Sequence, residues 1–100
     1  MNIQAKLDSA LIVRSFAYVA KQLARSGQYG NIPSEAEKHL GALRMVQRDV
    51  FDMTGQGLRE RTLTRAQFQR LRDAAVQATT QGQQAITRVA AQYVPHRLAA

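Results

Sequence analysis

Apolar side chains recur along most of the chain at steps of three and four residues, the period of a helix that buries one face. The alternating pattern typical of half-buried strands is nearly absent. The spacing predicts helices near residues 2–26, 35–53 and 65–94. We therefore expect a single all-α domain over residues 1–100, folded as an elongated three-helix bundle.

Capping and turn residues set the expected ends of the first two helices. Asn2 is a candidate N-cap, and Gly27 is expected to end the first helix. Ser34 followed by Glu37 has the spacing of a capping box, which places the second start near residue 35. The segment Thr54–Gly57 contains two glycines and is expected to end the second helix.

The third helix has the clearest start, because Thr64 and Gln67 form a second capping-box pattern. Gly82 lies on its apolar side, and the apolar positions keep the same phase before and after it. We therefore predict one long helix that ends before Pro95, with Gly82 allowing a close neighbour and marking the position of any bend. The alternative is a turn over residues 79–83 followed by a fourth helix.

Composition limits the class of protein. The chain has 100 residues and no cysteine, which fits one domain in a reducing compartment and excludes disulfides and cysteine nucleophiles. Its longest strongly apolar run, Ala10–Val13, is far shorter than the roughly 20 residues of a membrane span. We expect a cytoplasmic protein without a membrane partner.

Basic residues dominate the charge. Fourteen lysines and arginines stand against seven acids, giving a formal net charge of +7. Eleven of the fourteen are arginines, whose planar guanidinium matches phosphate and carboxylate and stacks on flat rings. This excess predicts a polyanionic partner or an acidic protein surface.

One group of basic residues lies on a single line of the first helix, where Arg14, Tyr18, Lys21 and Arg25 follow steps of four, three and four. Cations beside an exposed aromatic ring are typical of surfaces that bind single strands. In the alternative interpretation, Tyr18 covers an edge of the core, and Lys21 and Arg25 complement the helix dipole.

A second group surrounds the start of the third helix and comprises Arg59, Arg61, Arg65, Arg70 and Arg72. Arg65 and Arg72 share one flank of that helix, whereas Arg70 projects on another side. The group does not form one stripe. Either a partner wraps around the helix end, or only some of these arginines touch it.

The apolar residues of the first helix change face along its length. Ile3, Leu7 and Leu11 mark one side, and Phe16 lies on nearly the opposite side. Either this helix is sandwiched within the bundle, or its first half offers an apolar patch to a second molecule. A homodimer through Ile3, Leu7 and Leu11 is one such arrangement.

Catalytic and metal-binding patterns are scarce. Glu35 and His39 lie four residues apart and would make half of a metal site, but no second cluster at ligand spacing accompanies them. A surface hydrogen bond is the simpler interpretation. No phosphate-binding loop or nucleophile motif occurs. We expect a non-enzymatic protein without metal or cofactor.

These observations favour electrostatic binding of nucleic acid, preferably single-stranded, or of a nucleoprotein complex. One alternative is a helix-turn-helix regulator with Thr64–Arg72 as its recognition helix, although about ten residues separate the expected helices where that motif uses three or four. Another is an adaptor or inhibitor that binds an acidic protein surface and no nucleic acid.

In size, charge and lack of motifs, the chain resembles small helical proteins of phages and mobile elements, including type I anti-CRISPR inhibitors. The resemblance covers general character, and no motif carries it, so it assigns no residue a role. It implies an inhibitor of a CRISPR surveillance complex, an RNA–protein assembly whose DNA-binding surfaces such a protein could occupy.

Overall fold

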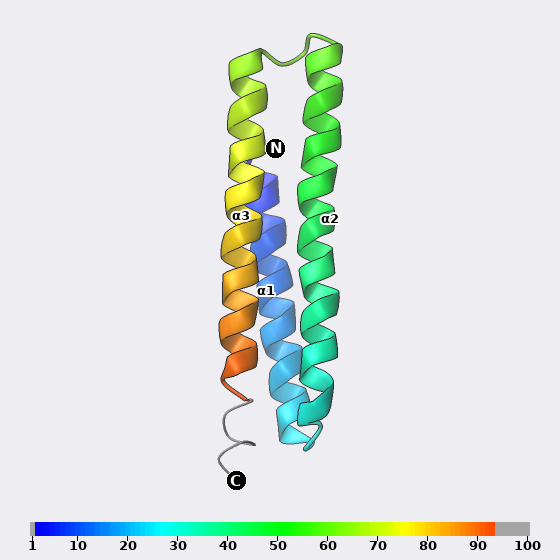
Figure 1. The fold of residues 1–100 in the computed structure, drawn as a ribbon, viewed down its shortest axis with the longest axis vertical. Coiled ribbons are helices and arrows are strands. Elements are labelled where there is room, and N and C mark those ends of the chain that lie inside the picture. Colours follow the sequence, from blue (N-terminus) through cyan, green and yellow to red (C-terminus); the bar gives the residue numbers. More distant parts are fainter. Residues whose placement is uncertain (1, 94–100) are drawn as a thin grey trace.

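The computed structural model describes residues 2–93, with side chains from Ala5 onward. Three long helices, α1 (Asn2–Arg25), α2 (Ile32–Arg59) and α3 (Arg65–Ala91), are joined by a short 3-10 helix η1 (Tyr29–Asn31) and a five-residue turn. In Figure 1, α2 and α3 run side by side in opposite directions, and α1 lies behind both. The expected elongated three-helix bundle is confirmed, with principal extents of 58 × 18 × 16 Å. Helix α3 ends at Ala91, three residues before the predicted end at residue 94, and Pro95 lies outside the described residues.

The start of α2 differs from the prediction. The helix begins at Ile32 with Asn31 as its N-cap, three residues before the expected start. Ser34 therefore lies inside the first turn, where its hydroxyl donates to the Asn31 carbonyl at 3.0 Å, and the predicted Ser34–Glu37 capping box is wrong. Pro33 suits the first turn because its fixed φ is helical, and burial of Ile32 anchors this turn in the core.

The end of α2 also differs, because the helix continues through the glycine-containing segment to Arg59. Thr54 is fully buried, and its hydroxyl donates to the Val50 carbonyl at 2.8 Å. Gly57 is buried against the following turn, where a Cβ would lie 2.8 Å from Cδ1 of Leu63. These residues serve packing inside the helix, so their weak helix propensity does not decide where it ends.

Helix α1 ends as predicted at a glycine. Gly27 has a φ of 75°. The N–H of Gln28 donates to the Leu23 carbonyl at 2.8 Å, and the N–H of Gly27 donates to the Ala24 carbonyl at 3.1 Å. This pair of bonds is a Schellman motif, which satisfies the last carbonyls of a helix through one left-handed residue.

Helix α2 ends in the same motif with a different residue at its centre. The N–H of Thr62 donates to the Gly57 carbonyl at 2.9 Å, and the N–H of Arg61 donates to the Leu58 carbonyl at 3.2 Å. Arg61 takes the left-handed position with a φ of 61°. Among the described residues it is the one non-glycine with a positive φ, a conformation that its Cβ disfavours.

Helix α3 follows the prediction closely. The Gln67 N–H donates to Oγ1 of Thr64 at 3.1 Å, and the Thr64 N–H donates to Oε1 of Gln67 at 2.8 Å, so the capping box is formed. The helix passes through Gly82 without a break, and the alternative of a turn and a fourth helix is wrong. A Cβ at Gly82 would lie 2.9 Å from Cδ1 of Leu43, which confirms the predicted close neighbour.

The core changes in character along the bundle. Its larger cluster centres on Phe16, Leu43 and Ile86, one from each helix and all fully buried. The other joins Ala5 of α1 to Val50 and Ala75, so this half of α1 packs through small side chains. As a result, the larger apolar residues of its first half are available to face solvent.

Candidate nucleic-acid interface

The positive charge of the protein is unevenly divided among its helices. Helix α2 holds four cations and four acids and is therefore neutral, whereas α1 and α3 each hold four cations and one acid. The excess thus lies on the two helices that flank α2. The cations are Lys6, Arg14, Lys21 and Arg25 on α1, and Arg65, Arg70, Arg72 and Arg88 on α3.

One exposed line runs along α1 and is called here the α1 ridge. It consists of Leu7, Leu11, Arg14, Tyr18, Lys21 and Arg25, which follow one another at alternating steps of four and three residues. Each of these side chains is exposed. The structure therefore joins two features that the sequence presented separately, the apolar patch and the first basic group.

The aromatic ring of the α1 ridge is available for contact. Tyr18 is 66% exposed, so it faces solvent and does not cover the core. Among the described side chains, ion pairs join Glu35 to Lys38 and His39, and none involves Arg14, Lys21 or Arg25. The ridge therefore carries charge that no acid of the described part neutralises by contact.

The apolar end of the ridge answers the question of how α1 is packed. Leu7 is 54% exposed and Leu11 is 55% exposed, so the helix is not sandwiched and presents an apolar patch. Isolated exposed leucines are ordinary, but here two lie on successive turns beside a cation. The side chain of Ile3 lies outside the described side chains.

The second basic group lies at the other end of the molecule. Arg59, Arg61 and Arg65 are exposed around the turn between α2 and α3, far along the long axis from the C-terminal end of α1 (Figure 1). The predicted recognition segment Thr64–Arg72 comprises the N-cap and the first residues of α3, which packs antiparallel to α2 (Figure 1). In a helix-turn-helix motif, by contrast, the two helices meet at about 90–120°.

Arg72 has a structural contact that sequence analysis missed. Its side chain is half-buried, with the guanidinium carbon 4.0 Å from the centre of the Phe51 ring and 5.0 Å from that of Phe68. The step of four from Phe68 was a detectable signal, whereas Phe51 lies on another helix. Because cation–π contacts hold this guanidinium, Arg72 is less available to a partner than the exposed Arg59, Arg61 and Arg65.

A groove of about 460 Å³ runs between α1 and α3. Five of the nine lining residues are serine, alanine or glycine, and Leu43 fills the space beside Gly82 from the α2 side. Two cations of α1 also line the groove, and one of them, Arg14, belongs to the α1 ridge. The lining residues are Lys6, Ser9, Ala10, Val13, Arg14, Ala78, Gln81, Gly82 and Ala85.

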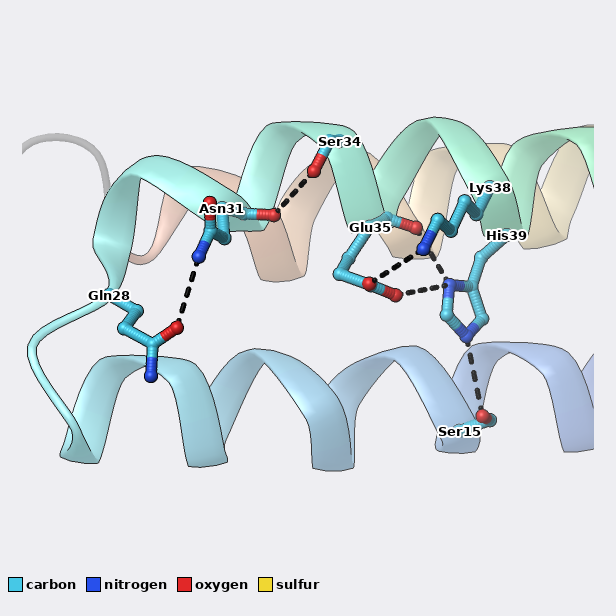
Figure 2. A network of polar contacts seen from close by, with 7 residues as sticks. All are labelled: Ser15, Gln28, Asn31, Ser34, Glu35, Lys38 and His39. Carbon is cyan, nitrogen blue, oxygen red and sulfur yellow. Dashed lines mark hydrogen bonds and ion pairs between the residues drawn. The ribbon is translucent and has the colours of Figure 1, made fainter.

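A polar network ties α2 to α1 (Figure 2). His39 Nδ1 lies 2.7 Å from the Glu35 carbonyl oxygen, and Nε2 lies 3.3 Å from Oγ of Ser15 on α1. The imidazole ring also packs against Phe16, with ring centres 5.4 Å apart. Both ring nitrogens of His39 therefore have partners within the protein. The Glu35–His39 pair orients the imidazole ring, which joins α2 to α1 through Ser15.

The described residues contain neither a metal-binding cluster nor a membrane-spanning helix. Among these residues, no three histidine, aspartate or glutamate side chains converge in a group that could hold a metal ion. None of the described helices combines the length and apolar character needed to cross a membrane. Comparison with known proteins finds no match to this chain among family models, curated proteins or solved structures.

Proposed function

We propose that this protein binds single-stranded nucleic acid along the α1 ridge, with Arg14, Lys21 and Arg25 contacting phosphates and Tyr18 stacking on a base. The observation that carries the proposal is an exposed line of three cations that form no ion pair with any described residue, around an aromatic ring that is 66% exposed. Single-strand binding combines a cationic track for the backbone with such a stacking platform.

The helical scaffold supports this mode of binding. Arg14 and Lys21 are seven residues apart, about 10 Å along the helix axis, and Tyr18 lies between them. Because α1 packs against both other helices, the ridge is held before a ligand arrives, and little ordering of the backbone is needed. Phosphate contacts and stacking do not read base edges, so we expect weak sequence preference.

The test is fluorescence anisotropy with labelled single-stranded and duplex oligonucleotides at several salt concentrations. Reversing the ridge cations in the triple variant R14E/K21E/R25E should abolish binding at moderate salt. If binding remains measurable at low salt, the magnitude of the log–log salt slope should fall by about 2, since each lost contact to a single strand contributes about 0.7. Helicity by circular dichroism should not change.

The chain offers a matched control on its neutral helix. The variant K38E/R44E/R48E also replaces one lysine and two arginines, all exposed, and lowers the net charge by the same amount. Equal loss of binding in both triples would reduce the effect to net charge and refute a ridge-specific site. Tyr18→Ala should weaken binding about tenfold with an unchanged salt slope, and Tyr18→Phe should retain it.

A second candidate function is favoured by the exposed leucines. Leu7 and Leu11 offer an aliphatic patch beside Arg14, which suits a protein surface that combines apolar and acidic groups. An adaptor or inhibitor of a nucleoprotein, such as a CRISPR surveillance complex, would use the ridge in this way. Two results together would favour this function over the first. The wild-type protein would bind no oligonucleotide at low salt, and Leu7→Glu would abolish capture of a purified nucleoprotein target.

A further inference from the structure

The groove between α1 and α3 contains a buried polar group without a partner. Ser9 lines this groove and is 5% exposed. Its hydroxyl is the one buried side-chain oxygen or nitrogen among the described residues that has no hydrogen-bond partner. Such groups are uncommon in folded proteins because burial without a partner is costly, and each calls for an explanation.

The surroundings of Ser9 have the chemistry of a small-molecule site. The walls are formed by small apolar residues, among them Ala10 and Gly82, with the amide of Gln81 at the α3 side. A volume of about 460 Å³ lies within the range of ligand pockets, which are mostly apolar with a few polar groups that fix orientation. The Ser9 hydroxyl is covered in its present rotamer, so contact with a ligand requires a change of χ1 to another staggered rotamer.

The charge at the groove identifies the kind of ligand. Lys6 and Arg14 both line it, whereas none of the lining residues is an acid. The complementary ligand therefore has a flat, largely apolar body with hydrogen-bonding edges and an anionic group. Arg14 also belongs to the α1 ridge. A strand whose phosphates contact the ridge therefore passes the groove at this arginine.

We infer that the groove holds one nucleotide of the bound strand, with its base between the small residues of α1 and α3 and its phosphate at Lys6 and Arg14. Gln81 lines the groove and hydrogen-bonds the base, and the Ser9 hydroxyl does so after a rotation about χ1. The link to a strand rests on the proposed function of the α1 ridge, but the groove itself is testable with a single nucleotide.

The direct experiment is an NMR titration of the isotope-labelled protein with adenosine 5′-monophosphate, with inorganic phosphate as a matched probe. The nucleotide should shift the backbone amide signals of Ser9, Ala10, Gln81 and Gly82, and phosphate alone should leave these four unchanged. Ala85→Leu, which fills the groove, should remove the shifts. Unmoved groove signals at millimolar nucleotide, or equal shifts with phosphate, would overturn the inference.

Variants of the polar groups separate a binding role from a packing role. Ser9→Ala should weaken binding of an oligonucleotide about threefold to tenfold, the loss expected for one neutral hydrogen bond, while the melting temperature stays equal or rises. A lower melting temperature with unchanged binding would assign Ser9 to packing and contradict its proposed contact. Gln81→Ala changes an exposed residue and keeps the test informative if Ala85→Leu disturbs the helix contact.

The two proposals fail in different ways. If the ridge triple variant abolishes oligonucleotide binding while Ser9→Ala, Gln81→Ala and Ala85→Leu all bind like the wild type, the groove is refuted and the ridge stands. If the wild type binds no oligonucleotide but adenosine 5′-monophosphate shifts the groove signals, the strand-binding function falls and the groove remains a nucleotide site.

Discussion

The end of α2 yields the sharpest prediction for stability, because the same Schellman motif occurs twice in this protein with different central residues. Arg61 adopts a φ of 61° where a glycine, Gly27, occupies the equivalent position of α1. A left-handed conformation costs a residue with a Cβ about 1–2 kcal/mol, and glycine avoids this cost but loses more backbone entropy on folding. Replacing Arg61 by glycine should therefore raise the free energy of unfolding by about 1 kcal/mol.

The measurement is thermal and urea unfolding followed by circular dichroism, with Arg61→Ala as the reference. Alanine removes the same charge near the helix C-terminus but keeps the Cβ, so the difference between the two variants isolates the backbone effect. For a domain of this size, 1 kcal/mol corresponds to about 4–8 °C in melting temperature. If Arg61→Gly melts no higher than Arg61→Ala, the proposed backbone strain is refuted.

The reciprocal change provides an internal check of the same reasoning. A Cβ at Gly27 would meet no atom within 4 Å, so Gly27→Ala tests the backbone conformation without a steric clash. It should lower the free energy of unfolding by about 1 kcal/mol. An unchanged stability would show that a left-handed residue in this motif tolerates a Cβ. The Arg61 side chain is exposed, so its charge is available to a partner.

Four further variants test the packing and capping of the bundle by urea unfolding. Gly41→Ala should raise the free energy of unfolding by about 1 kcal/mol through better helix propensity. Gly82→Ala should lower it by about 1 kcal/mol because the new methyl group meets Leu43, and equal effects of the two variants would refute this close contact. Thr64→Ala should cost about 1 kcal/mol through loss of the cap on α3, and an unchanged midpoint would contradict this. Arg72→Gln should cost about 1 kcal/mol through loss of the cation–π contacts, whereas a neutral effect would show that they contribute no net stability.

The candidate site was only partly predictable. The step of four, three and four placed Arg14, Tyr18, Lys21 and Arg25 on one line, because helical periodicity depends on the chain alone. Whether that line faces solvent depends on which faces of α1 the other two helices cover. The contact of Arg72 with Phe51 joins two helices, so no local pattern contained it.

By itself, the sequence determined the all-α class, the glycine end of α1 and the cap of α3, because these depend on interactions within a few residues. Tertiary structure decided both ends of α2, where burial of Ile32 and Gly57 outweighed local capping and turn signals. It also decided the groove, whose polar residues Ser9 and Gln81 are brought together by packing of α1 against α3. Residues close in sequence determine where a helix forms. A groove between helices exists only when segments distant in sequence pack against each other.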